Sequence, residues 1–256
     1  MRIQQTRAEA PKGEFDNKVA IVTGSTSGIG EATARELVAA GAKVIFNSSS
    51  SVEAGKALAT ELGKSACYHR ADVSSESECI GMVETTLETF GQLDILVNNA
   101  GYTQLIPHHD LGSVSEEVFR RVIDVNLFGT WYLSRAAVAA LKASGDGNIV
   151  NITSIAGLRA VGSSIPYSVS KAAINHLTRL MANVLGPEIR VNAVAPGLVA
   201  TPWTETWDAI HEAVAERAPL GRSATPEDCA AAVLGILRAG YQTGDVVVVD
   251  GGLTLA

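Results

Sequence analysis

The chain has 256 residues, 46% of them hydrophobic, so it is long enough to bury one large core. Its net charge of -7 and its scattered Lys and Arg residues argue against nucleic acid and anionic membranes as partners. The three cysteines lie at unrelated spacings, which predicts reduced thiols, no disulfide framework and no metal site. No apolar run approaches the roughly 18 residues of a membrane span, so we expect a cytoplasmic protein without a membrane partner.

Short apolar runs alternate with helical patterns along almost the whole chain. Residues 1–16 carry interspersed charges and little periodicity, and we expect a flexible or loosely docked tail there, followed by one domain over residues 17–256. Strands are predicted at 19–22, 43–46, 66–70, 95–97, 148–152, 190–194 and 246–249. Helices are predicted after the first strand as far as Ala40 and at 52–62, 76–90, 115–143, 167–185 and 226–237, with a loop and short helices over 196–222. This alternation predicts an α/β, doubly wound (Rossmann) fold with a mainly parallel seven-stranded sheet and helices on both faces.

A glycine-bearing segment, Thr23 to Gly30, lies between the first strand and the first helix. Glycines allow a tight turn and a close approach of the backbone to a ligand, and the helix start offers free N–H groups to a pyrophosphate. The segment therefore predicts a dinucleotide site. Its spacing differs from Gly-x-Gly-x-x-Gly, so an ordinary tight turn from strand to helix is the alternative.

The end of the second strand bears on the choice of cofactor. Asn47, Ser48 and Ser49 stand where an NAD-binding protein would place a carboxylate against the ribose 2'-hydroxyl. Without that carboxylate, and with hydroxyls able to donate to a 2'-phosphate, the sequence favours NADP as cofactor. NAD remains the alternative, because no Arg or Lys occupies the glycine turn or the positions just after this strand.

Tyr167 and Lys171 lie four residues apart in a predicted helix, so their side chains share one face. A nearby ammonium stabilises a phenolate, and we therefore expect Lys171 to lower the pKa of Tyr167. A phenol of that kind would serve as a general acid or base. The alternative is an ordinary amphipathic helix with an exposed lysine.

Further signals occur in one order along the chain: Asn98-Asn99-Ala100-Gly101, then Asn126, then Ser154 13 positions before Tyr167, then Pro196-Gly197 and the closing Val248-Val249-Asp250-Gly251-Gly252. Together with the glycine turn, this order resembles the short-chain dehydrogenase/reductase family from about residue 17 to 254. The resemblance implies that Tyr167 exchanges a proton with the substrate oxygen, Lys171 lowers its pKa and holds the nicotinamide ribose, Ser154 hydrogen-bonds the reacting oxygen, and Asn126 anchors a water that links Lys171 to solvent.

The resemblance also implies where a dinucleotide would bind. Besides Tyr167 and Lys171, the implied contacts are at Gly24, Ser25, Ser27, Gly28, Ile29 and Gly30, at Asp72 and Val73, at Asn98, Ala100 and Gly101, and at Pro196, Gly197, Val199 and Thr201. With Ser48 and Ser49 from the second strand, these residues make up the predicted cofactor site.

Trp203 and Trp207 lie in the segment where the family has a substrate loop. They are expected either to cap an apolar substrate or to pack into the core or a subunit contact. The function expected is hydride transfer between the cofactor and a ketone or secondary alcohol, with 3-oxoacyl thioesters as one substrate class. An NAD-linked alcohol or sugar dehydrogenase and a non-catalytic dinucleotide-binding scaffold are the alternatives. The resemblance further suggests a homotetramer.

Overall fold

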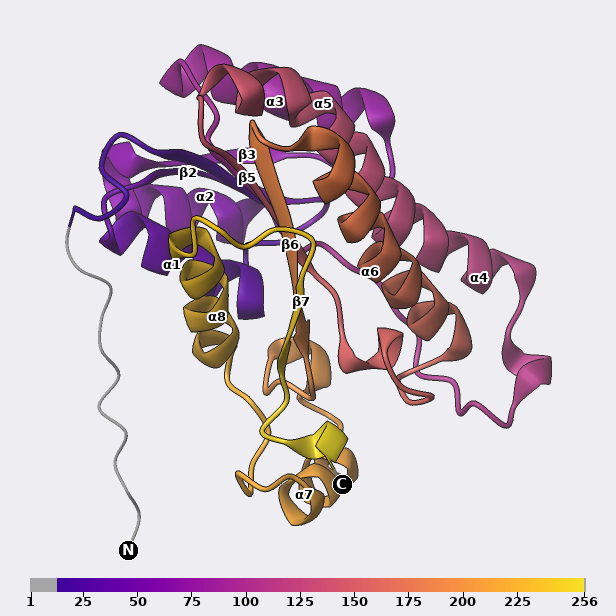
Figure 1. The fold of residues 1–256 in the computed structure, drawn as a ribbon. Helices are drawn as coiled ribbons and strands as arrows, with labels where there is room; N and C mark the ends of the chain where they lie inside the picture. Colours follow the sequence, from indigo (N-terminus) through magenta and orange to yellow (C-terminus); the bar gives the residue numbers. More distant parts are fainter. Residues whose placement is uncertain (1–12, 256) are drawn as a thin grey trace, which may run out of the picture.

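A computed structural model describes residues 13–255, and these residues form a three-layer α/β fold (Figure 1). Seven parallel strands make one sheet in the order β3-β2-β1-β4-β5-β6-β7. The strands are β1 Val19–Val22, β2 Lys43–Ser48, β3 Ala66–Arg70, β4 Ile95–Asn98, β5 Gly147–Ile152, β6 Ile189–Pro196 and β7 Val246–Val249. The predicted doubly wound sheet is confirmed.

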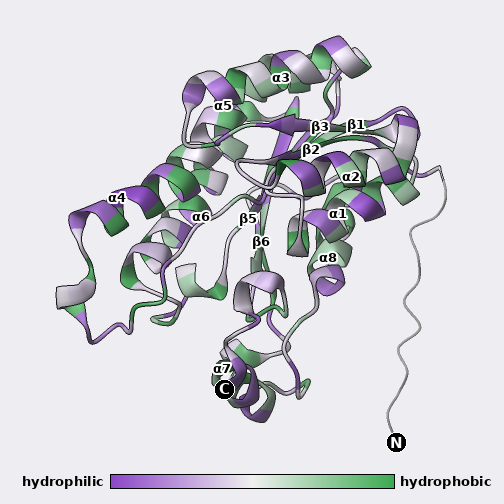
Figure 2. Ribbon diagram, turned by 180° about the vertical axis from the view of Figure 1, so that it is seen from behind, coloured by the Kyte–Doolittle hydropathy of each residue, from purple (hydrophilic) through white to green (hydrophobic). Residues whose placement is uncertain are grey.

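The helices cover both faces of the sheet. They are α1 Gly28–Ala39, α2 Val52–Leu62, α3 Glu76–Phe90, α4 Glu116–Ile123, α5 Gly129–Ala143, α6 Ile165–Leu185, α7 Asp208–Arg217 and α8 Pro226–Arg238. Along most of them hydrophobic and hydrophilic residues alternate in bands, as expected for helices with one buried face (Figure 2). Among the described residues, no helix is both long and apolar enough to cross a membrane.

Two hydrophobic clusters lie on opposite faces of the sheet, because successive strand residues point to opposite sides. In β1, Ala20 and Val22 pack with α1 and α8, whereas Ile21 between them packs with α3, α5 and α6. Strand β2 repeats the pattern, with Val44 and Phe46 on the first face and Ile45 on the second. Strands buried on both faces explain why the sequence shows continuous apolar runs.

The chain reverses its direction across the sheet after β3. From β1 it adds β2 and β3 on one side, and then returns to place β4 on the other side of β1. The carboxyl ends of β1 and β4 therefore flank a switch point, which is where open α/β sheets bind ligands. The glycine turn follows β1 and Asn99 follows β4, so both segments open onto this crevice.

The predicted helix over 115–143 is interrupted. The Ser115 hydroxyl accepts a hydrogen bond from the N–H of Val118 and caps α4, and a π-helical turn over Asp124–Phe128 then joins α4 to α5. A π turn carries one extra residue and re-aims the side chains within it. Asn126 lies in this turn and is fully buried.

Most of the expected tail, residues 1–12, lies outside the described residues. Residues 13–16 are docked on the domain, because Phe15 is buried among α1 and α8 residues and its N–H donates to the carbonyl of Ala40. The carboxylate of Glu14 also pairs with the guanidinium of Arg238 in α8.

Candidate active site

The glycine turn has a backbone that side chains would disrupt. Gly24 and Gly28 both have φ of +58°, in the left-handed region that favours glycine. A Cβ at Gly30 would lie 2.5 Å from the carbonyl oxygen of Gly24, so helix α1 packs onto the turn only because Gly30 has no side chain. The three glycines therefore allow a tight loop over the end of β1.

Asn99 ties this turn to the end of β4. Its Nδ2 donates to the carbonyl oxygens of Thr23 at 2.8 Å and Gly24 at 3.0 Å. In return, the Thr23 hydroxyl accepts from the N–H groups of Asn99 and Ala100 at 2.9 Å. These hydrogen bonds join the loop after β1 to the loop after β4. They therefore hold the two walls of the crevice in fixed positions.

The start of α1 suits a dinucleotide pyrophosphate. Ser27 is the N-cap residue, but its side chain makes no capping hydrogen bond, which leaves N–H groups of the first turn open to an anion. Gly28 faces Thr201 across the crevice, since a Cβ there would lie 3.2 Å from the Thr201 methyl group. The residues present therefore fit a nicotinamide dinucleotide lying along the carboxyl ends of the strands.

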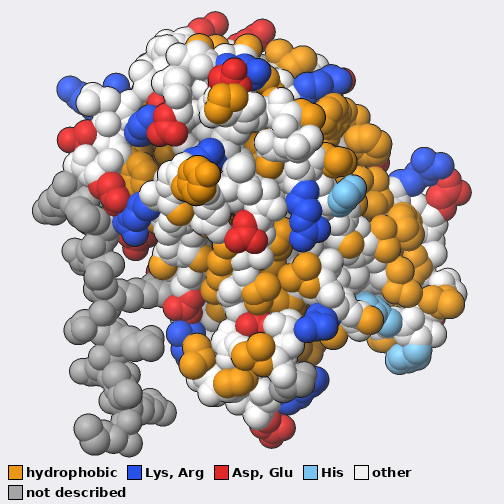
Figure 3. Space-filling view, in the orientation of Figure 1, with side chains coloured by type: hydrophobic (Ala, Val, Ile, Leu, Met, Phe, Trp, Pro, Cys, Tyr) orange, Lys and Arg blue, Asp and Glu red, His pale blue; other side chains and the backbone are white. Residues whose placement is uncertain are grey.

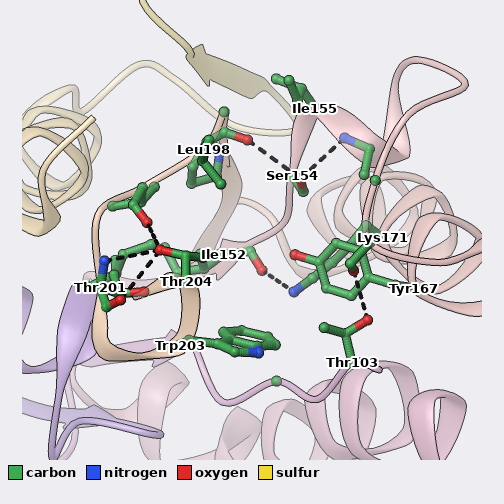
Figure 4. A pocket seen from close by; sticks show the side chains of 18 of the residues that line it. Thr103, Ile152, Ser154, Ile155, Tyr167, Lys171, Leu198, Thr201, Trp203 and Thr204 are labelled. Atoms are coloured by element: carbon green, nitrogen blue, oxygen red, sulfur yellow. Dashed lines mark hydrogen bonds between the residues drawn. The ribbon is translucent and has the colours of Figure 1, made fainter. Parts of the chain in front are cut away.

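Tyr167 and Lys171 lie on one face of α6 and point toward the end of β5 (Figure 4). The Nζ of Lys171 donates to the carbonyl oxygen of Ile152 at 2.8 Å and lies 5.6 Å from the centre of the Tyr167 ring. Lys171 is buried, whereas Tyr167 keeps part of its surface open to the cavity. The predicted pairing on one helix face is therefore present.

Ser154 meets Tyr167 from the loop after β5. Its hydroxyl accepts from the N–H of Ala156 at 3.1 Å and lies 3.4 Å from the carbonyl oxygen of Pro196. It also lies near enough to the Tyr167 hydroxyl to favour the charged form of that phenol and so lower its pKa. The two hydroxyl groups that are 13 positions apart in the chain thus face the same point in space.

Burial sets the proton affinities of the pair. Desolvation raises the pKa of Tyr167 to about 12, and the influence of the neighbouring Ser154 side chain opposes this rise only in part. Desolvation also lowers the pKa of Lys171 to about 8. The net pKa of Tyr167 is therefore raised, and not lowered as the sequence suggests, because desolvation of the phenol is the largest effect on it.

Asn126 holds the loop after β4 against α6. Its Oδ1 accepts from the N–H of Tyr102 at 2.7 Å, while its Nδ2 donates to the Tyr102 carbonyl at 3.0 Å and to the Ser170 hydroxyl at 2.9 Å. Both donor positions of this amide and one acceptor position of its oxygen are thus used within the protein. It positions the segment around Gly101, where a Cβ would lie 3.8 Å from Lys171 Nζ.

Comparisons with known proteins identify the family. A family model described as enoyl-(acyl carrier protein) reductase matches residues 24–254. A Streptomyces violaceoruber protein named as ketoacyl reductase 2 of the granaticin polyketide synthase is 51% identical, over 93% of this chain and 96% of the relative. The chain belongs to the short-chain dehydrogenase/reductase family. It is accordingly an oxidoreductase of carbonyl and alcohol groups.

Two further relatives show how widely the family resemblance extends. A 3-alpha-(or 20-beta)-hydroxysteroid dehydrogenase of Mycobacterium tuberculosis is 39% identical, over 94% of this chain and 90% of the relative. The crystal structure of a Brucella melitensis short-chain dehydrogenase/reductase, described as glucose/ribitol dehydrogenase, superposes with a TM-score of 0.90 at 32% identity. That match covers 96% of this chain and 100% of the other.

The dehydrogenase/reductase has a cavity of about 1310 Å³ at the carboxyl ends of its strands. The catalytic candidates Ser154, Tyr167 and Lys171 line it. So do ten of the predicted cofactor residues: Gly24, Ser27, Gly28, Ile29, Ala100, Gly101, Pro196, Gly197, Val199 and Thr201. The structure therefore brings most of the predicted site into one space.

The other predicted cofactor residues do not line this cavity. They are Ser25, Gly30, Ser48, Ser49, Asp72, Val73 and Asn98. Ser25 is fully buried and donates to the Val22 carbonyl, and the Ser48 hydroxyl lies 2.9 Å from the Tyr68 hydroxyl. Asn98 points into the protein, where its Nδ2 donates to Ser134 and Asn151.

Helix α7 and the segment before it cover the cavity. Trp203 stands edge-on to Tyr167, with ring centres 6.3 Å apart, and Trp207 also lines the cavity, so both tryptophans lie at the site rather than in the core. None of the α7 residues is buried. His211 fastens the helix, because its Nε2 lies 3.1 Å from the Thr204 carbonyl and its Nδ1 lies 2.8 Å from the Ser223 hydroxyl.

Several cavity residues had no signal in the sequence. Leu105, Val161 and Ile210 add apolar surface, Arg159 and Arg217 add charge, and the C-terminal turn adds Leu253, Thr254 and Leu255. These residues come from four separate loops and helices, so only the folded chain shows that they share a cavity. Asn99 follows Asn98 directly in the chain, but only Asn99 lines the cavity, because the two side chains point in different directions.

The glycine turn gives the first testable prediction. Gly28→Ala should weaken binding of the reduced nicotinamide cofactor about tenfold, because a left-handed φ costs an L-residue roughly 1–2 kcal/mol and the new methyl would crowd Thr201. Fluorescence titration with NADPH measures the change. Gly81→Ala in α3, where a Cβ has open space, is the control. Equal affinities of the two variants would contradict the assignment of this turn.

Proposed function

We propose that the protein is an NADP-preferring reductase of ketones, working reversibly on the corresponding secondary alcohols, with 3-oxoacyl thioesters as one substrate class. The observation that carries the proposal is that the Tyr167 and Ser154 side chains line one cavity, with the Lys171 ammonium 5.6 Å from the centre of the Tyr167 ring. The similarity to a protein named as a ketoacyl reductase supports the substrate class.

The roles of the side chains follow from their positions. A nicotinamide cofactor supplies the hydride when bound. The Ser154 hydroxyl donates a hydrogen bond to the carbonyl oxygen of the substrate, and Tyr167 transfers its proton to the same oxygen as negative charge develops there. The Lys171 ammonium then stabilises the phenolate that Tyr167 becomes. In the alcohol-oxidising direction the phenolate takes the proton back.

Substitution of the pair separates these roles. Tyr167→Phe should lower kcat at least about 100-fold, the scale of general acid catalysis, and change NADPH affinity only a few fold. Lys171→Ala should damage both turnover and cofactor binding. Tyr132→Phe on α5 is a matched control, since the Tyr132 ring stacks on Phe128 outside the cavity. Substantial ketone reduction by the Tyr167 variant would refute the mechanism.

The pH dependence follows from the same two groups. With a pKa of about 12, Tyr167 keeps its proton throughout the range from pH 6 to 10. With a pKa of about 8, Lys171 loses its charge as the pH rises through that value, and the phenolate then lacks its stabilising cation. At saturating NADPH, kcat/KM for ketone reduction should be level below about pH 7 and fall above pH 8. A profile that stays level to pH 10 would contradict this.

Arg70 supports the NADP preference. The sequence shows no cation just after β2, but strand pairing places Arg70 of β3 opposite Ser48. Its Nε donates to the Ser49 carbonyl at 3.1 Å, and its Nη1 pairs with Glu78 at 2.8 Å. The guanidinium thus lies between the two segments expected to hold the adenosine, where a 2'-phosphate would need a positive partner.

Arg70→Gln tests this preference. The variant should raise KM for NADPH about tenfold and leave KM for NADH within about twofold, since only NADPH carries the phosphate. Arg120→Gln is the control, because Arg120 is another exposed arginine paired with a glutamate, on α4. If the unmodified protein binds NADH more tightly than NADPH, it is an NAD-linked dehydrogenase and the NADP assignment falls.

We further propose that the protein is a homotetramer. Exposed apolar side chains support this: Phe119, Phe128 and Trp131 on α4, the π turn and α5, and Val169, Leu180 and Val184 on α6. Figure 3 shows hydrophobic side chains gathered over α6 and α4. Apolar patches of this kind mark contacts between chains. Light scattering should give four times the 26.7 kDa of one chain, and a monomer mass would contradict the proposal.

A further inference from the structure

The charges that line the cavity are all positive. Among the described residues, Arg159, Lys171 and Arg217 line it, and no Asp or Glu does. The chain as a whole has 27 acidic residues against 20 Lys and Arg. Lys171 belongs to the reacting groups at the floor, which leaves two arginines with no role in the chemistry described above.

Neither of these arginines is neutralised by a carboxylate of the described chain. Seven other arginines are: Arg35, Arg70, Arg120, Arg121, Arg135, Arg222 and Arg238. Arg159 makes one hydrogen bond, from Nη2 to the Thr254 carbonyl at 3.3 Å. A guanidinium has five N–H donors, so most donors of the two residues are open to a ligand.

The position of Arg217 on α7 directs it toward the cavity. The residues of α7 that line the cavity are Ile210, Ala213, Val214 and Arg217, at the three- and four-residue spacing of one helix face. The acidic residues of the same helix, Asp208, Glu212 and Glu216, do not line it. The cavity face of α7 is therefore apolar up to its last position, where the cation stands.

The C-terminal turn brings Arg159 and Arg217 to the same side of the cavity. Arg159 bonds Thr254 in this turn, and the N–H of Leu220, three residues after Arg217, donates to the Gly251 carbonyl at 3.1 Å. The C-terminal turn, residues 253–255, lies beside α7 in Figures 1 and 2. Both arginines are exposed, whereas Ser154 and Lys171 are buried, so the cations stand at the mouth and the reacting groups at the floor.

We propose that the substrate carries an anionic group, a carboxylate or a phosphate, which Arg159 and Arg217 bind at the mouth of the cavity. The apolar part of the substrate then lies against Trp203 and Val214, and its ketone reaches Tyr167. Guanidinium groups suit this role because they bind carboxylate and phosphate oxygens through paired N–H donors. The inference rests on the proposed ketone reduction and specifies its substrate.

Matched pairs of ketones test the inference. The first pair is 4-oxocyclohexanecarboxylate and its neutral methyl ester, compared with the unmodified protein and the Arg159→Gln/Arg217→Gln double variant. The unmodified protein should have the higher kcat/KM for the carboxylate. In the double variant, kcat/KM for the carboxylate should fall about tenfold, as expected for the loss of two exposed ion pairs. Its kcat/KM for the ester should stay within about twofold of that of the unmodified protein. Glutamine keeps an amide donor for the Thr254 carbonyl.

A second pair distinguishes the source of the anion. The 3-oxobutanoyl thioester of pantetheine 4'-phosphate carries a phosphate, and that of N-acetylcysteamine is neutral. If the double variant loses kcat/KM only for the phosphate thioester, the anion belongs to the pantetheine phosphate arm that carries the acyl group. If it loses kcat/KM only for 4-oxocyclohexanecarboxylate, the anion belongs to the ketone substrate itself. Either result supports the inference. Equal kcat/KM within both pairs for the unmodified protein would overturn it.

Arg179→Gln on α6 is the control, because Arg179 is also exposed and has no carboxylate partner among the described residues, but does not line the cavity. An equal loss of kcat/KM in this variant would overturn the inference.

Binding is measured apart from turnover by quenching of Trp203 and Trp207 fluorescence in the presence of NADP. If the protein reduces no ketone, the proposed function is wrong. The inference about the anion is then tested by the Kd of each anionic ligand alone. A Kd for 4-oxocyclohexanecarboxylate or the phosphate thioester about tenfold weaker in the double variant supports it, and an unchanged Kd for both overturns it.

Discussion

The active site depends on the hydrogen bond from Lys171 Nζ to the carbonyl oxygen of Ile152, 2.8 Å long and buried. This bond ties helix α6 to the last residue of β5. Because Tyr167 lies one helical turn before Lys171, fixing the lysine also fixes the face of α6 that carries the phenol. Ser154 follows two residues after Ile152, so the same contact places both hydroxyl groups at one point. A shift of α6 along β5 would separate them.

Burial then decides the chemistry of these groups. In an exposed helix, an ammonium four residues away would stabilise the phenolate of Tyr167. Here desolvation dominates for both residues, raising the pKa of Tyr167 to about 12 and lowering the pKa of Lys171 to about 8. Tyr167 therefore starts as a proton donor, which suits ketone reduction. Lys171 is needed mainly after the proton has left, when the phenolate requires a cation.

The sequence predicts those parts of the protein that repeat along the chain. Buried parallel strands produce apolar runs that are visible in the sequence. Tyr167 and Lys171 lie in one helix, so their four-residue spacing alone predicts that they share a helix face. Features set by neighbours distant in sequence were not predictable. Arg70 meets Ser49 only through the register of β3 on β2. The π turn around Asn126 likewise depends on contacts with the β4 loop and α6. The rise in the pKa of Tyr167 needed the depth of the cavity, which no spacing reveals.

In the proposed mechanism, Tyr167 and Ser154 hold one substrate oxygen between them at the floor of the cavity. A crystal structure of the protein with NADP and a bound ketone tests this most directly. We expect the carbonyl oxygen to lie within hydrogen-bond distance of both hydroxyl groups, about 2.6–3.2 Å, with the nicotinamide ring against the carbonyl carbon. A ketone bound with its oxygen away from Tyr167 in a turnover-competent complex would contradict it.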